Sequence, residues 1–163
     1  MGKTENKESV YPKTFRVVSV TSGKGGMGKT NITVNLGLTL AKGGRKVLIM
    51  DADLGLANVD VVLGVTPKVD LRHVIFEGGN IEDCITHGPE GVDILSGSSG
   101  VSELTHLDTE QKWALLEALE PLGERYDTLL IDTAAGIGSN VQFFTSAAQE
   151  VVLVVGHKPT SLT

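Results

Sequence analysis

Cysteine, aromatic residues and basic charge are all scarce in this 163-residue chain. Its one cysteine, Cys84, cannot form a disulfide within the chain or complete a CxxC metal or redox site. The formal net charge of −6 gives no strong nucleic-acid signal, because proteins that hold DNA without sequence preference need a basic face. No apolar run approaches the roughly 20 residues that span a bilayer, and no signal peptide opens the chain, so we expect a cytoplasmic location.

The remaining composition is that of one globular domain. With 40% hydrophobic residues, a chain of this length can bury one good core, and two domains are not expected. Residues 1–14 are polar, lack periodicity and contain Pro12. We therefore predict a flexible leader over 1–14 and a single domain over 15–163.

Short apolar runs recur along the chain and predict the strands of a sheet. They are FRVVSVTSG (15–23), RKVLIMDAD (45–53), VDILSG (92–97), YDTLLIDTAAG (126–136) and EVVLVVG (150–156). Near-continuous apolar strands suit a parallel sheet that is covered on both faces, and the intervening segments are long enough for crossover helices. We predict an α/β fold with a doubly wound, mostly parallel sheet and helices on both faces.

The stretch GKGGMGKT, from Gly23 to Thr30, fits the phosphate-loop pattern G-x-x-x-x-G-K-[ST] and follows a predicted strand. Glycines there let backbone N–H groups approach phosphate oxygens, which a Cβ would prevent. Lys29 is expected to neutralise the β- and γ-phosphates and Thr30 to offer its hydroxyl to Mg²⁺. The predicted nucleotide-binding residues, for ATP or ADP, are Gly25, Gly26, Met27, Gly28, Lys29, Thr30 and Asn31. The alternative is a glycine-rich turn with incidental lysines.

Two helices are predicted. Behind the loop, apolar residues alternate with period two and favour a strand, but a phosphate loop requires a helix N-terminus, and Gly43-Gly44 would end that helix. A second helix should begin at Asp108, whose spacing to Gln111 suits a capping box. The apolar face predicted for this second helix consists of Trp113, Leu116 and Leu119.

Three aspartates end predicted strands. Asp132 follows LLI at the sheet edge where ligands bind in open α/β folds, so it is either a Mg²⁺-holding carboxylate or a turn residue. Asp51 and Asp53 are two apart and would point the same way in an extended chain. Two neighbouring carboxylates repel unless a cation or a moving proton lies nearby. We expect Thr30, Asp51 and Asp132 near Mg²⁺ and Asp53 to position the attacking water. The alternative is that Asp53 only caps the short helix after Asn58.

The stretch SGKGGMGKTNITVNLGLTLAKGGRKVLIMDADLGLANVDVVLGV resembles the MinD/ParA family of deviant Walker ATPases, which carries a K-G-G-x-G-K-[ST] loop and a D-x-D switch. Within it, DADLGLANVDVVLG, GPEGVDILSGSSG and IDTAAGIGSNVQFF are most similar to the flagellar-number regulators of the FlhG (FleN) branch. The resemblance covers nearly the whole chain from residue 15. It implies the P-loop NTPase fold, truncated on the C-terminal side.

The resemblance also implies catalytic roles for Lys24, Lys29 and Asp53. Lys24 matches the signature lysine that reaches the partner's nucleotide across an ATP-bound homodimer, and a cation supplied in trans stabilises charge on the transferring phosphoryl group. Asp53 and Asn58 match the first switch, and residues 132–138 match the second. The alternative for Lys24 is contact with the nucleotide of its own chain.

The implied function is a Mg²⁺-dependent ATPase, acting on the β–γ phosphoanhydride, whose dimer controls flagellar number and placement. MinD-type division-site placement and ParA-type partitioning are the alternatives. Family members engage partners such as the GTPase FlhF through a D-Q-A helix that residues 1–14 do not show. They bind membranes through a C-terminal helix beyond this chain, so only a longer form is expected at the inner membrane face.

Two apolar features have plainer interpretations. Cys84 is expected to fill a small apolar site. The apolar residues after the D-A-D motif belong either to the core or to a partner surface, and we expect a mixture among Leu54, Leu56, Val59, Val61, Val62 and Leu63.

Overall fold

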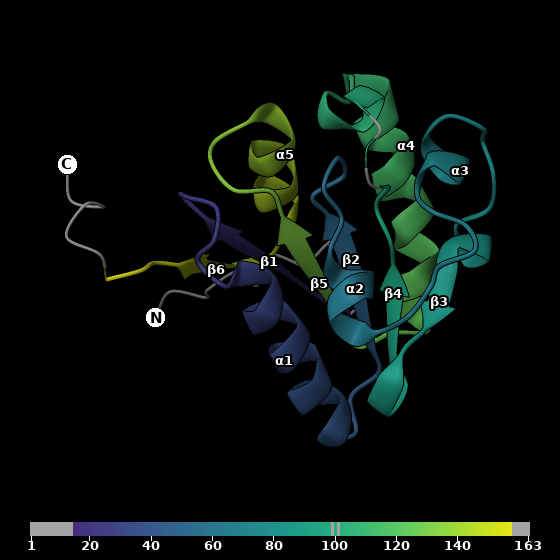
Figure 1. Ribbon diagram of the computed structural model, residues 1–163. Helices are drawn as coiled ribbons and strands as arrows, with labels where there is room; N and C mark the ends of the chain where they lie inside the picture. The colour runs from purple at the N-terminus through teal and green to yellow at the C-terminus, as the bar shows by residue number, and fades with distance from the viewer. Residues whose placement is uncertain (1–14, 99, 101, 158–163) are drawn as a thin grey trace, which may run out of the picture.

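The computed structural model describes residues 15–98, 100 and 102–157, which form one six-stranded sheet in the order β3-β4-β2-β5-β1-β6 (Figure 1). The leader predicted over 1–14 lies outside the described residues. The five predicted strands are confirmed and pair in parallel; they are β1 (Arg16–Ser22), β2 (Val47–Ala52), β4 (Val92–Leu95), β5 (Thr128–Thr133) and β6 (Glu150–Val154). The short strand β3 (Ile85–His87) was not predicted, and it pairs antiparallel with β4.

Helices cover both faces of the sheet, as predicted. Figure 1 shows α1 (Lys29–Lys42) and α2 (Val59–Leu63) in front of it and α4 (Thr109–Leu119) and α5 (Ser139–Ala147) behind it. The remaining short helices are α3 (Arg72–Ile75), η1 (Ile81–Cys84), η2 (Pro89–Gly91), η3 (Ser102–Thr105) and η4 (Glu120–Glu124). Across residues 15–98, 100 and 102–157, no helix combines the length and the apolarity that crossing a bilayer requires.

Strand alternation divides the core into two clusters. Along β2, Val47 and Ile49 pack with α1 and α2, whereas Leu48 and Met50 pack with α3, α4 and α5. All six residues of β2 are buried, because a central strand has both of its faces covered. This burial on both sides explains the continuous apolar run, and it confirms the doubly wound prediction.

Helix α1 forms despite its period-two hydrophobicity, as we predicted. Its buried residues are Lys29, Thr33, Val34 and Gly37, whose spacing is helical although only Val34 has a large apolar side chain. Gly37 lets the helix lie close to β2, since a Cβ there would be 2.7 Å from Cδ1 of Ile49. Hydropathy alone misleads here because polar and small residues occupy the inward face.

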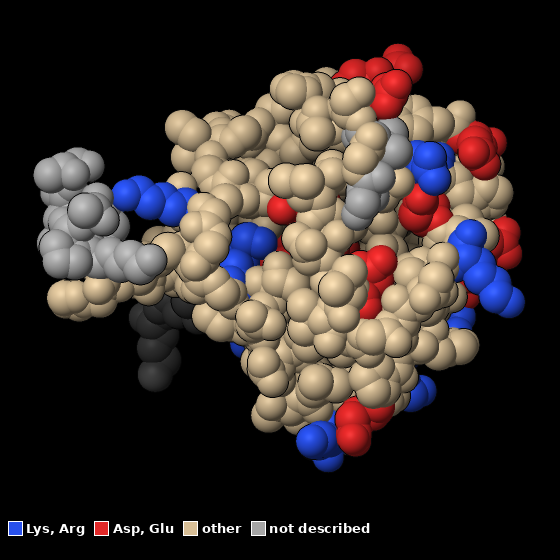
Figure 2. Space-filling view, in the orientation of Figure 1, with Lys and Arg blue, Asp and Glu red and all other residues tan. Residues whose placement is uncertain are grey.

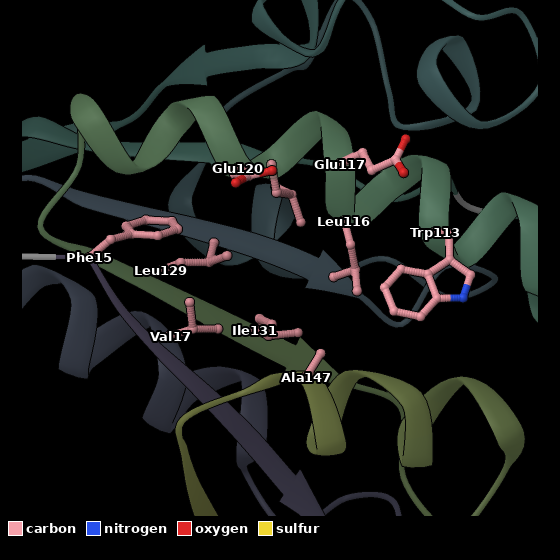
Figure 3. A pocket seen from close by; sticks show the side chains of 10 residues that line it. Phe15, Val17, Trp113, Leu116, Glu117, Glu120, Leu129, Ile131 and Ala147 are labelled. Atoms are coloured by element: carbon pink, nitrogen blue, oxygen red, sulfur yellow. The ribbon is translucent and has the colours of Figure 1, made fainter. Parts of the chain in front are cut away.

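Helix α4 begins with the predicted capping box between Asp108 and Gln111, but its predicted face is only partly correct. Leu115 and Leu119 are the buried residues, whereas Trp113 is 56% exposed. Figure 3 shows Trp113 and Leu116 over an apolar groove of about 230 Å³. Val17 of β1 and Phe15, which directly precedes that strand, line the same groove, which lies between α4 and the sheet.

Cys84 is fully buried in the core, as expected, and its thiol donates to the Asp70 carbonyl at 3.2 Å. Burial raises the pKa of this thiol to about 11, so it stays protonated at neutral pH. The residue therefore packs rather than reacts.

The burial of Leu115 makes α4 a test of the core. Leu115→Ala should lower the free energy of unfolding by about 2–5 kcal/mol, because it removes buried methyl groups and leaves a cavity. Glu117→Ala on the same helix should change it by less than about 0.5 kcal/mol. Urea denaturation followed by circular dichroism would measure both, and equal effects of the two variants would contradict this packing.

Candidate functional site

Three loops meet at the carboxyl edge of the sheet, after β1, β2 and β5. Because β5 lies between β1 and β2, Asp132 is in register with both Val20 and Asp51. The loops enclose a pocket of about 370 Å³. It is lined by Ser22, Gly25, Gly26, Met27, Gly28, Lys29, Thr30, Asn31, Asp53, Asn58 and Ala135. Every residue predicted to bind the nucleotide therefore lines one pocket.

The pocket ends on the N-terminus of α1. Gly26 and Gly28 have φ values of 73° and 80°, a left-handed conformation that L side chains rarely adopt. Helix α1 begins directly after Gly28, so its first N–H groups and its dipole favour an anion in the pocket. This geometry can hold phosphate oxygens through the backbone.

Asp132 gathers the polar side chains of α1 beneath the pocket. Its Oδ1 accepts from Lys29 Nζ at 2.9 Å, and its Oδ2 accepts from the Thr30 hydroxyl at 2.7 Å. Thr33 also donates its hydroxyl to Oδ1, at 3.3 Å. The Asp132 side chain is only 1% exposed, so the ammonium and hydroxyl groups compensate for the burial of its charge. Thr33 was missed, although it lies one helical turn after Lys29.

Asp51 lies behind the pocket, bound to the backbone of the following loop. Its oxygens accept from the N–H groups of Asp53 (3.2 Å), Asn58 (2.7 Å) and Val59 (2.9 Å). Burial, assisted by the charge of Asp132, raises the pKa of Asp51 to about 7 despite these hydrogen bonds. The carboxylate that accepts from the N–H groups at the start of α2 is thus Asp51 rather than Asp53.

Asp53 faces the pocket from the loop after β2. It is partly exposed, and burial raises its pKa while the nearby charge of Lys29 opposes that rise. A carboxylate with a raised pKa, in reach of a phosphate site, can accept a proton from water. Of the paired aspartates, Asp53 is the one that lines the pocket.

Lys24 lies on the same loop but does not line the pocket. Its side chain is exposed, and the Ser22 hydroxyl donates to its backbone carbonyl at 3.0 Å. The structure thus separates the two lysines of the loop, since Lys29 is buried on Asp132.

Apolar side chains beside the pocket divide as expected into core and surface. Leu54 and Val59 are buried, whereas Leu56 is 70% and Val61 74% exposed. Ile137, in the loop after β5, is 84% exposed. Figure 2 shows the face that carries α1 and α2, with Lys and Arg in small separate groups and uncharged residues over most of its middle. Exposed apolar side chains therefore lie on the segments that carry Asn58 and Ala135, two residues that line the pocket.

The pair formed by Lys29 and Asp132 makes a stability test possible. Asp132→Ala should destabilise the nucleotide-free chain by about 3–5 kcal/mol, because it leaves a buried ammonium without its partner. Glu150→Ala, which breaks the exposed pair with Arg16, should cost less than about 1 kcal/mol. Urea denaturation would measure both, and a larger cost for Glu150→Ala would contradict the assigned burial.

Comparison with known proteins gives this site a context. Residues 15–163 match the AAA_31 family, described as an AAA domain. Antiactivator FleN of Pseudomonas aeruginosa is 51% identical over 95% of this chain and 55% of FleN. The flagellum site-determining protein YlxH of Helicobacter pylori is 34% identical over 93% of this chain and 54% of YlxH.

A solved structure shares both the fold and the sequence pattern. The septum site-determining protein MinD from Pyrococcus horikoshii, complexed with Mg-ADP, has a TM-score of 0.79 and 35% identity, over 91% of this chain and 60% of MinD. The chain spans about half the length of the curated relatives it matches. On its phosphate loop, its sheet and these matches, the chain belongs to the AAA_31 family, in the MinD/ParA group of P-loop proteins that includes FleN.

Proposed function

We propose that this chain binds ATP with Mg²⁺, hydrolyses it, and uses the nucleotide state to switch a homodimer that controls flagellar number and placement. The observation that carries the proposal is the pocket on the α1 N-terminus, with Lys29 and Thr30 joined by Asp132 beneath it and Asp53 at its side. The flagellar role is supported by the similarity to FleN and YlxH.

The residues around Thr30 fit a magnesium ion, which prefers oxygen ligands and keeps several waters. The Thr30 hydroxyl and the Asp132 carboxylate are already adjacent at 2.7 Å and would hold the ion, with Asp132 acting through water. Asp51 lies behind them and supports the site through the backbone of the loop. The ion would neutralise charge on the β- and γ-phosphates.

Groups of the chain itself would bind the phosphates and activate the attacking water. Backbone N–H groups of the loop and the Lys29 ammonium bind and orient the phosphates. Asp53 orients water toward the terminal phosphate and takes its proton. The buried Lys29 would thus serve binding, and the partly exposed Asp53 would act in the chemical step.

Lys24 supports the dimer part of the proposal. Its side chain is exposed and does not line the pocket of its own chain. In a dimer whose two pockets face each other, Lys24 of each chain would reach the nucleotide bound to the other chain. The exposed Leu56 and Ile137 beside the pocket would be covered in such a dimer. Hydrolysis would then depend on dimerisation, because the second cation comes from the partner.

Septum placement of the MinD kind is the second candidate, and the 35% identity to Pyrococcus horikoshii MinD favours it over partitioning of the ParA kind. The net charge of −6 offers little for the non-specific DNA binding that partitioning would use. In either role we propose a cytoplasmic ATPase, with an FlhF-like GTPase as one candidate partner in the flagellar case. Deletion of the gene, followed by counting flagella and minicells, would separate the two roles.

Lys24→Ala tests the assignment of the two lysines. It should leave the Kd for ATP close to that of the parent while abolishing ATP-dependent dimers. Lys29→Ala should weaken nucleotide binding by about tenfold or more, the loss expected for a charge-assisted hydrogen bond. Titration with a fluorescent ATP analogue and light scattering would measure both. Equal loss of affinity in the two variants would show that Lys24 serves its own chain.

Asp53→Ala tests the chemical step. It should keep ATP binding and give a persistent ATP-bound dimer, while single-turnover hydrolysis falls by about 10²–10⁴-fold, as for a lost general base. Asp60→Ala provides the control, because Asp60 is an aspartate of the neighbouring α2 helix that does not line the pocket. Hydrolysis that survives Asp53→Ala would remove this residue from the mechanism.

A further inference from the structure

Helix η3 lies between two of the loops that border the nucleotide pocket, and neither motif nor mechanism assigns it a role. On one side it contacts the loop that carries Asp53. A Cβ built on Gly55 would be 2.6 Å from Cγ2 of Thr105, so the threonine methyl lies directly against this glycine. Gly100, just before η3, donates its N–H to the Gly55 carbonyl at 3.1 Å.

On its other side η3 is held by Asn140, the second residue of α5. The Asn140 amide donates to the carbonyls of Leu104 (3.1 Å) and Thr105 (3.2 Å). Two carbonyl acceptors fix the orientation of the amide, because only its NH₂ end can face them. Asn140 is 9% exposed, and its Oδ1 finds no hydrogen-bond partner among the described residues. Burying an oxygen without a partner costs free energy, so the two hydrogen bonds that the NH₂ group donates are what hold the Asn140 side chain in place.

These contacts form a continuous path from α5 to Asp53. Leu104 is fully buried and anchors η3 in the core. A cavity of about 140 Å³ lies between η3, the loop of Asp53 and the start of α5, and both Asp53 and Asn140 line it. Asp53 also lines the nucleotide pocket. A shift of η3 would therefore move the loop that presents Asp53 to the nucleotide.

We propose that Asn140 is a positioning residue that holds the loop of Asp53 in place through η3. It links the start of α5, which follows the loop after β5, to the loop after β2. The inference deepens the proposed ATPase function, on which its kinetic consequence rests, but the mechanical link itself can be tested without nucleotide. Asn140 lies outside the phosphate-loop motif. Its link to the Asp53 loop is indirect and runs through Thr105 and Gly55.

Hydrogen exchange in the nucleotide-free chain tests the link directly. Asn140→Ala should make the amides of residues 53–58 exchange about tenfold faster or more, the change expected for two lost hydrogen bonds, while β2 and β5 remain protected. Gln142→Ala is the matched control, because that amide donates to Ile137 in its own turn instead of to η3. Unchanged exchange over residues 53–58 would overturn the proposal.

A second pair of variants covers the case in which Asn140→Ala loosens the whole chain. Gly55→Ala should push against the Thr105 methyl and speed exchange over residues 53–58. Adding Thr105→Ser removes that methyl, keeps the hydroxyl and should restore the parent rate. Failure of the second substitution to restore protection would overturn the contact between η3 and the Asp53 loop.

Kinetics then distinguish this inference from the proposed function. If the parent hydrolyses ATP, Asn140→Ala should lower the single-turnover rate about tenfold while leaving the Kd for ATP unchanged, the pattern of a misplaced group instead of a lost binding contact. An unchanged rate would overturn the positioning role. A parent without hydrolysis would refute the proposed function, whereas faster exchange over residues 53–58 would still support the link.

Discussion

A buried ion pair between α1 and the central strand β5 is the interaction on which the rest of the site depends. Lys29 and Asp132 are both nearly inaccessible to water, so neither charge is stable there without the other. The hydroxyls of Thr30 and Thr33 also donate hydrogen bonds to the Asp132 carboxylate. Holding the first turn of α1 against β5 in this way fixes the helix N-terminus, and the glycine loop before it is left as the wall of an anion pocket.

A second buried carboxylate organises the neighbouring loop by a different means. Within the part of the chain that the structure describes, Asp51 pairs with no lysine and is stabilised by backbone N–H groups of the segment that follows it. Because those donors belong to the loop and to the start of α2, satisfying Asp51 folds the loop around it. Asp53 is thereby turned toward the pocket, and the exposed Leu56 and Val61 are turned outward.

An element from farther along the chain joins the loops beside the pocket. Helix η3 contacts Gly55 on one side and is held by Asn140 on the other, so the loops after β2 and β5 are joined by a packed element as well as by the sheet. The proposed nucleotide switch would require the loops after β2 and β5 to move together. The contacts of η3 with Gly55 and Asn140 supply a physical basis for that coupling.

The sequence by itself determined the phosphate loop, the five parallel strands and the helix that follows the loop, because each depends on a local pattern of glycine, lysine or apolar residues. It did not show which of Asp51 and Asp53 accepts from the N–H groups at the start of α2, that Thr33 reaches Asp132, that β3 pairs with β4, or that Asn140 holds η3. Thr33 and Asp132 are 99 positions apart, and Asn140 and Leu104 are 36 apart. Only the tertiary structure decided these contacts, because a buried polar group takes whichever partner the packed sheet and helices bring within hydrogen-bond distance, and no local periodicity records that choice.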